Sequence, residues 1–184
     1  MIFHIAAIAF FASTIGAICG IGGGVIIKPV MDAFGVMDVS VINFLSGCTV
    51  LSMTCYSVIK AKRAGDSQIE FAIDTPLAIG GGPINLVVLF YFFSMPTKRA
   101  AQSSLYIILF SQAASTVASL ATGGAAGVDM LMLVVMACCG ILSGFAGRKV
   151  NSRIDDRAVD KLFIGLMVVI MGICVFNMIK YMGV

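Results

Sequence analysis

The chain has 184 residues, of which 60% are hydrophobic and only 11% charged, and its formal net charge is +3. A soluble domain usually carries about 25% charged residues, so the composition excludes an ordinary water-soluble domain and indicates an integral membrane protein. The basic residues are then signals of membrane topology rather than a surface for nucleic acid. The lipid bilayer is therefore an expected partner, and nucleic acid is not.

Uncharged windows along the chain predict the membrane-spanning helices. They cover residues 5–27, 39–59, 75–97, 100–128, 130–147 and 162–179, and most reach the roughly 18–20 residues that a crossing needs. The first window has no basic segment before it, so it is not expected to be a cleavable signal peptide. We predict an all-α integral membrane protein of about five to six spans together with half-helices that are broken by glycine.

A glycine triplet occurs twice inside apolar sequence. Gly22–Gly24 and Gly80–Gly82 lie 58 residues apart, and the same offset aligns Ser46 with Ser104. Each copy consists of an apolar run, the triplet, a short apolar stretch, a turn and a full span. We interpret the copies as two structural repeats, residues 1–63 and 64–122, followed by two C-terminal spans in residues 123–184, all in a single membrane domain.

Basic residues lie at opposite ends of the two copies. Lys60–Arg63 follows the long span of the first copy, whereas Lys98–Arg99 precedes that of the second. Because basic residues stay on the cytoplasmic side, the repeats are predicted to have inverted topology, as in many transporters whose substrate site lies at the repeat interface. The segment between the two basic sites starts and finishes on one side, which predicts a re-entrant hairpin that turns at Gly80–Gly82. The N-terminus is predicted outside if residues 2–35 form a hairpin, and inside if residues 2–19 cross alone.

The broken helices are predicted to form an anion site. A half-helix that begins at Gly82–Pro83 would present free N–H groups and the positive end of its dipole to a cavity in the membrane. Pro83 suits the first helical position because it has no N–H to lose. The first triplet can do the same from the opposite face, and Lys28 adds a full positive charge. Two alternatives remain: Lys28 snorkels to the interface beside Asp32, with which it can pair at i,i+4, and the triplets serve tight helix packing.

Polar residues on the long spans complete the predicted site. Asn43 and Ser46 lie three residues apart on one helix face, and three polar residues begin the matching span of the second copy. Hydrogen bonding between helices is the alternative use of such residues. The full predicted substrate-binding set is Gly22, Gly23, Gly24, Lys28, Asn43, Ser46, Gly80, Gly81, Gly82, Pro83, Asn85, Gln102, Ser103 and Ser104.

The other notable residues indicate scaffold rather than chemistry. The six cysteines contain no CxxC pair and the single His4 has no ligand set around it, so no metal and no cofactor are expected. No Ser–His pair, HExxH motif or carboxylate pair within a span points to an enzyme. Gly140 and Gly144 predict plain helix packing, and Asp155 and Asp156 are expected to favour the N-terminus of the last helix.

These motifs resemble those of the sulfite exporter TauE/SafE family. The resemblance rests on "GIGGG" at residues 20–24, "GGGPINL" at residues 80–86 and "GILSGFAGRKVNSRIDDRAVDKLFIGLMVVI" at residues 140–170. It implies a multi-pass permease of the bacterial inner membrane that exports or imports sulfite, sulfonates or related organic anions. Members are usually longer, and the later helices of the first repeat are missing from this chain.

Two functions follow. The leading hypothesis is a secondary transporter for a small anion, with sulfite, a sulfonate or another organosulfur anion as its substrate. The alternative is a shortened membrane subunit that is inactive in transport or depends on a partner. A homodimer or a completing subunit is then the expected protein partner.

Overall fold

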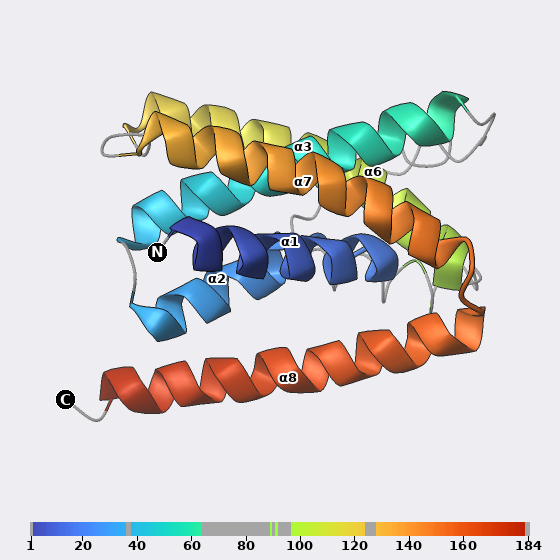
Figure 1. Ribbon diagram of the computed structural model, residues 1–184. Helices are drawn as coiled ribbons and strands as arrows, with labels where there is room; N and C mark the ends of the chain where they lie inside the picture. The colour runs from blue at the N-terminus through green and yellow to red at the C-terminus, as the bar shows by residue number, and fades with distance from the viewer. Residues whose placement is uncertain are drawn as a thin grey trace.

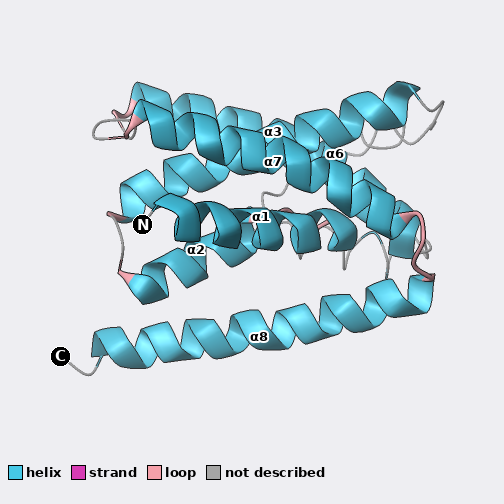
Figure 2. Ribbon diagram, in the orientation of Figure 1, coloured by secondary structure: helices cyan, strands magenta, loops and turns pink. Residues whose placement is uncertain are grey.

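The fold consists of helices throughout the part of the chain that the computed structural model describes, namely residues 2–35, 38–63, 89, 91, 97–123 and 128–182. The helices are α1 (Ile2–Cys19), α2 (Gly24–Phe34), α3 (Val39–Arg63), α6 (Thr97–Ala121), α7 (Met130–Asn151) and α8 (Asp156–Met182), as Figure 1 shows. No strand occurs among these residues (Figure 2). The predicted all-α membrane fold is confirmed.

Four of the described helices are long and apolar enough to cross a bilayer. The candidate spans of α3, α6, α7 and α8 have 25, 22, 22 and 25 residues, and the 18-residue windows within them have mean hydropathies of 1.4, 1.4, 2.2 and 2.7. At 1.5 Å per residue, 22 residues extend about 33 Å, which matches a hydrocarbon core of about 30 Å. By contrast α2 has only 11 residues, or about 16 Å, and is too short to cross alone.

The helix ends form two groups at opposite ends of the bundle (Figure 1). One group holds the start of α1, the α2–α3 connection, the α6–α7 connection and the C-terminus; the other holds the end of α3, the start of α6 and the α7–α8 loop. The second group carries ten of the twelve Lys and Arg residues, namely Lys60, Lys62, Arg63, Lys98, Arg99, Arg148, Lys149, Arg153, Arg157 and Lys161. By the positive-inside rule we expect this to be the cytoplasmic end, and the first group to be the outer end.

The predicted window of residues 5–27 is two helices rather than one crossing. In Figure 1, α1 starts at the outer end, and α2 returns from it to the same end. The N-terminal segment is thus a hairpin. The sequence predicts an N-terminus outside for this arrangement, and the side of the membrane stays a prediction.

The charge pattern also predicts that α3 ends where α6 begins, and Figure 1 shows both at the cytoplasmic end. Consequently α3 and α6 run in opposite directions, which is the relation that the long spans of two inverted repeats require. The predicted re-entrant hairpin between them lies almost wholly outside the described residues. The division into repeats therefore stays a prediction.

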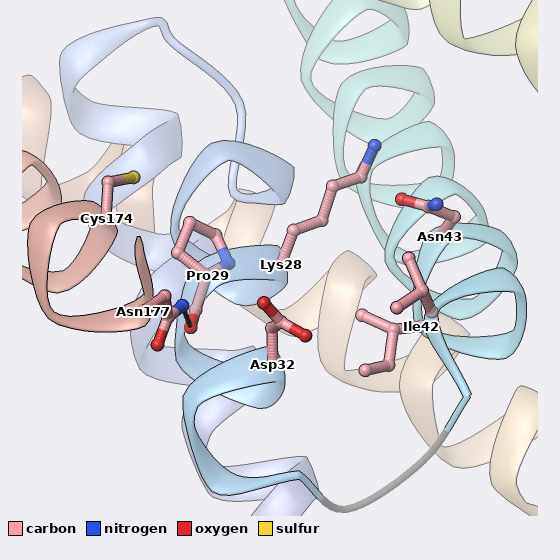
Figure 3. Close-up of a pocket in the computed structure, with 8 residues that line it drawn as sticks. Lys28, Pro29, Asp32, Ile42, Asn43, Cys174 and Asn177 are labelled. Atoms are coloured by element: carbon pink, nitrogen blue, oxygen red, sulfur yellow. Dashed lines mark hydrogen bonds between the residues drawn. The ribbon is translucent and has the colours of Figure 1, made fainter. Parts of the chain in front are cut away.

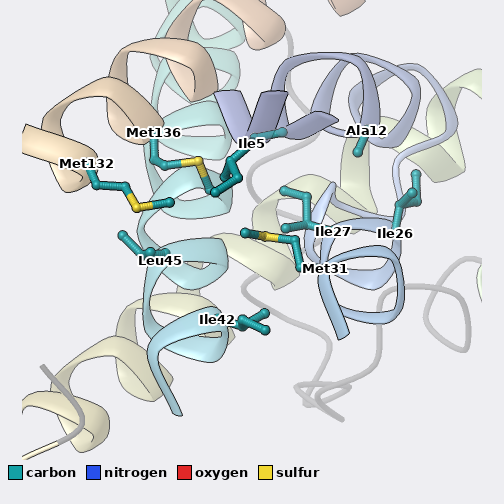
Figure 4. Packing of buried hydrophobic residues seen from close by; sticks show 10 residues of the cluster. Ile5, Ala12, Ile26, Ile27, Met31, Ile42, Leu45, Met132 and Met136 are labelled. Carbon is teal, nitrogen blue, oxygen red and sulfur yellow. The ribbon is translucent and has the colours of Figure 1, made fainter. Parts of the chain in front are cut away.

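The main core joins α1, α2, α3 and α7. Ile5, Ala9 and Ala12 of α1 pack with Ile26, Ile27 and Met31 of α2, and with Ile42, Leu45, Met132 and Met136 (Figure 4). Ile27, Leu45 and Met136 have no exposed surface. Such close packing, rather than the hydrophobic effect, holds helices together inside lipid, so α2 is fixed in place by its apolar face.

Small residues allow α7 to approach α3 and α1. A Cβ built on Gly140 would collide with the carbonyl oxygen of Thr49 on α3, and one on Gly144 would lie 3.0 Å from the carbonyl oxygen of Met53. At Gly147 the neighbour is Ala17 of α1, 2.6 Å from the added Cβ. The packing role predicted for Gly140 and Gly144 is confirmed.

This packing can be tested by one substitution made at two glycines. Gly140→Ala should lower the free energy of unfolding by about 1–3 kcal/mol, the usual cost of overpacking, because its methyl group meets the α3 backbone. Gly165→Ala on α8 is the matched control, since nothing lies within 4 Å of a Cβ at that position. Thermal unfolding of the purified protein in detergent measures both. Equal melting temperatures for the two variants would contradict the close approach of α3 and α7.

Candidate functional site

The chain breaks between α1 and α2 at glycines in the left-handed conformation. Gly20 has φ 72° and Gly22 has φ 75°, values that residues with a Cβ rarely adopt. The carbonyl of Gly16 accepts hydrogen bonds from the amides of Ile21 (3.1 Å) and Gly22 (3.3 Å), which ends α1. After the break, the amide of Ile27 donates to the carbonyl of Gly23 at 2.9 Å and α2 begins.

The break packs tightly against α6 and α3. The buried hydroxyl of Ser104 on α6 donates a hydrogen bond to the carbonyl of Gly20, and a Cβ on Gly20 would collide with the backbone of Ala101. Val50 of α3 lies 3.2 Å from a Cβ built on Gly24. The first glycine triplet therefore lies at the predicted break and also packs closely, as the packing alternative requires, and the anion site stays a prediction.

A buried hydroxyl faces the start of α2. Ser13 of α1 has no exposed surface, and its Oγ has no hydrogen-bond partner among the described residues. It lies against the backbone of Gly23, at 2.6 Å from a Cβ built there. The first amides of α2, those of Gly24 and Val25, have no acceptor inside their own helix and mark the positive end of its dipole. An unpaired hydroxyl thus lies beside a helix end that favours negative charge.

A hollow of about 280 Å³ opens among α2, α3 and α8 near the outer end (Figure 3). Its lining residues are Lys28, Pro29, Asp32, Val39, Ile42, Asn43, Cys174 and Asn177. The Lys28 side chain extends along the hollow toward Asn43, as Figure 3 shows. The hollow thus combines one ammonium, one carboxylate and two side-chain amides in a largely apolar wall.

Side chains of α8 hold the C-terminal half of α2. The Nδ2 of Asn177 donates to the carbonyl of Pro29 at 3.0 Å (Figure 3), and the Nζ of Lys180 donates to the carbonyl of Ala33 at 3.0 Å. A positive charge at the C-terminal end of a helix is favourable because it opposes the negative end of the dipole. Asn177 therefore both lines the hollow and fixes α2.

The structure divides the predicted site residues among several places. Lys28 and Asn43 line the outer hollow, whereas the first glycine triplet and Ser104 meet at the break between α1 and α2. Gln102 lies instead near the cytoplasmic ends of α3 and α7. Ser46 and Ser103 are buried, and the Ser46 hydroxyl donates to the carbonyl of Asn43 at 3.1 Å. The predicted residues Gly80, Gly81, Gly82, Pro83 and Asn85 lie outside the described residues.

Ser13 and Asn177 belong to these places but escaped the sequence analysis. Each is a polar residue within an apolar run, "FFASTIG" for Ser13 and "VFNMIK" for Asn177. That is the signal by which they could have been found, because polar groups within a span are costly unless partnered. Sequence alone does not say which helix face is turned inward.

One family matches the chain. The family model described as "Sulfite exporter TauE/SafE" matches residues 72–173, which is more than half of the 184 residues. The matched part includes all of α6 and α7 and more than half of α8. No curated protein and no solved structure matches the chain.

The contact between the break and α6 can be tested at two glycines of positive φ. Gly20→Ala should destabilise the protein by about 1–2 kcal/mol for the left-handed backbone, and by about 1–3 kcal/mol more for the collision with α6. Gly35→Ala is the matched control, because its φ is 59° and nothing lies within 4 Å of a Cβ there. Unfolding midpoints in detergent give the difference between the two variants. Equal losses of stability would show that α6 does not press on Gly20.

Proposed function

The chain belongs to the sulfite exporter TauE/SafE family of membrane transporters, and we propose that it carries a small, singly charged sulfur oxyanion across the bacterial inner membrane. Sulfite in its hydrogen sulfite form and an organic sulfonate are the substrates with this chemistry. One observation carries the proposal. Lys28 lies on α2, a half-helix too short to cross the membrane by itself, and its ammonium lines the outer hollow. An ionisable residue at such a place marks a substrate path by default.

The outer hollow offers the right donors for a sulfonate or sulfite group. The Lys28 ammonium has three N–H donors and the Asn43 amide has two, and both line the hollow. The oxygen atoms of a sulfur oxyanion accept hydrogen bonds from several directions at once, so they suit donors from two helices. The volume of about 280 Å³ leaves room for ordered water around so small an anion.

The charge of the hollow favours a monoanion over a dianion. Lys28 and Asp32 line the same space, so the fixed charges there sum to about zero. A dianion such as sulfate would meet the Asp32 carboxylate with one more uncompensated charge than a sulfonate does, and such repulsion is weakly screened inside a protein. Sulfate is therefore expected to compete poorly.

Alternating access is expected to move α8 and the outer end of α2 against α3 and α7, while the apolar face of α2 slides on the core that it shares with α3 and α7. Hydrogen bonds from Asn177 and Lys180 join α8 to α2, whereas glycines pack α7 directly onto the α3 backbone. Two pairs that are each held firmly, with a hollow between them, suit the rocking of one bundle against another. In the present conformation the hollow faces the outer end.

Replacing the charge of Lys28 tests the proposal. Lys28→Gln should lower kcat/KM for sulfite uptake into proteoliposomes at least 10-fold, because a hydrogen bond to a charged group contributes about 1.5–3 kcal/mol. Lys62→Gln, an exposed residue at the opposite end of the bundle, is the matched control and should stay within about 2-fold of the unmodified protein.

Competition in the same assay tests the charge of the substrate. A 10-fold excess of a sulfonate should reduce the flux of labelled sulfite more than a 10-fold excess of sulfate does. Saturable flux that is indifferent to Lys28→Gln would contradict this site, and the absence of flux from a folded, correctly inserted protein would contradict the transport function.

A shortened subunit that needs a partner is the alternative. It is favoured by an apolar hollow of about 420 Å³ between α2 and α8, which is lined by Val30, Ala33, Phe34, Val169, Gly172, Ile173 and Phe176. On α8, Gly165 and Gly172 have nothing within 4 Å of an added Cβ, and small residues commonly mark helix interfaces in membranes. A second copy of the chain or a completing subunit would cover this face.

Crosslinking in native membranes tests the alternative. If α8 forms such an interface, a cysteine placed at Gly165 should give a disulfide-linked species of higher mass on mild oxidation. A cysteine at the exposed Leu120 of α6 is the control for random collision. Only monomer from the Gly165→Cys variant would count against the homodimer, and flux from the purified chain alone would count against a required subunit.

A further inference from the structure

A second polar cluster lies near the cytoplasmic ends of α3, α6 and α7. Ser57 of α3, Gln102 and Tyr106 of α6 and Arg148 of α7 line a space of only about 10 Å³. The Nη1 of Arg148 donates to the carbonyl of Ser57 at 2.8 Å. Three helices therefore direct polar groups at one small gap, at the end opposite the Lys28 hollow.

The hydroxyl of Ser57 differs from those of its neighbours on α3. Thr49, Ser52 and Thr54 each donate to the carbonyl four residues earlier, at 2.8, 2.9 and 2.8 Å. Ser57 is 1% exposed, and its Oγ has no hydrogen-bond partner among the described residues. A buried hydroxyl without a partner costs free energy, and its own helix offers a carbonyl that it does not use. The Ser57 hydroxyl is therefore available to form a hydrogen bond with a ligand that enters the gap.

Arg148 brings positive charge to the same gap. Its guanidinium has five N–H donors in a planar fork, and the one recorded bond goes to a neutral carbonyl. That bond brings no negative charge to the guanidinium. A guanidinium fork fits two oxygen atoms of an oxyanion at once, which an ammonium does not. Gln102 supplies a further amide at the edge of the gap.

We propose that Arg148 and Ser57, with Gln102, form a cytoplasmic binding position for the same class of oxyanion. This inference rests on the proposed function and adds a second binding position, the cytoplasmic station, to it. A space of 10 Å³ holds about one water molecule, so the station is closed while the outer hollow is open. Movement of α6 away from α3 and α7, which stay packed together, opens the gap and exposes Ser57 and Arg148 to an anion from the cytoplasm.

Ser57→Ala is the sharpest test, because it removes a hydroxyl that holds nothing in the fold. In proteoliposomes sorted by orientation, the KM for labelled sulfite presented at the cytoplasmic face should rise at least 5-fold, while the KM at the outer face should change less than 2-fold. Ser52→Ala is the matched control on the same helix, since the Ser52 hydroxyl is bonded to its own helix. Equal KM values for Ser57→Ala and Ser52→Ala at the cytoplasmic face would overturn the proposal and leave the transport function intact.

Arg148→Gln separates binding from folding. The KM at the cytoplasmic face should rise at least 10-fold, and Arg148→Lys should restore part of the loss because it keeps the charge but not the fork. Lys149→Gln removes the same charge from the neighbouring exposed residue and should leave both KM values within 2-fold. If Arg148 only supports α3, its loss lowers the melting temperature and the number of active molecules, and the two KM values stay unchanged.

Equilibrium binding distinguishes failure of this station from failure of the transport function. If the unmodified protein shows no flux, the proposed function fails, and binding of labelled sulfite to the full chain in detergent still tests the station. Binding that weakens at least 5-fold in Arg148→Gln but not in Lys149→Gln supports the station without transport. Equal binding by both variants overturns it.

Discussion

The structure depends on hydrogen bonds for the backbone amides and carbonyls that the helix break frees inside the membrane. Lipid offers no hydrogen bonds, so each freed amide or carbonyl must find a partner in the protein. At the break, the carbonyl of Gly16 takes two amides, and the hydroxyl of Ser104 donates to the carbonyl of Gly20. These contacts need α6 at very short range, which explains why glycine stands at Gly20, where a Cβ would enter the α6 backbone. The position of α6 and the shape of the N-terminal hairpin thus follow from one requirement.

The same requirement explains why α8 carries polar residues. Since α2 is too short to cross, its C-terminal carbonyls also need partners, and the side chains of Asn177 and Lys180 reach those of Pro29 and Ala33. One end of α2 is thereby tied to α6 through the break, and the other end is tied to α8. A half-helix held at both ends by different helices transmits movement of either helix to Lys28, which lies between the ties. The outer hollow is thus the place where displacement of α8 would change the surroundings of the charge.

The sequence predicts the parts of this arrangement that depend on spacing and charge, and misses those that depend on helix faces. The glycine triplet predicts the broken helix, and basic residues predict that α3 ends where α6 begins. Helix rotation is different, because an apolar helix in lipid shows little amphipathic contrast between its inner and outer faces. The sequence predicts Asn43 and Ser46 together in the site. Asn43 borders the hollow, whereas the Ser46 hydroxyl donates a hydrogen bond to the Asn43 carbonyl. For the same reason Ser13, Ser57 and Asn177 could not be selected from the other polar residues in apolar runs without the packing of their neighbours.

One face of α3 connects the polar places of the molecule. Asn43, Val50 and Ser57 follow one another at intervals of seven residues, so they lie on the same side of the helix about 10 Å apart in succession. Asn43 borders the Lys28 hollow, Val50 touches the glycine break where α2 begins, and Ser57 accepts the Arg148 contact. The positive groups met along this face are an ammonium, the positive end of a helix dipole and a guanidinium. The ammonium and the guanidinium belong to the two proposed binding positions, one at each end of the face. A carrier needs sites that are strong enough to receive an ion and weak enough to release it, and two separate proposed positions along one helix face meet that condition better than a single deep one.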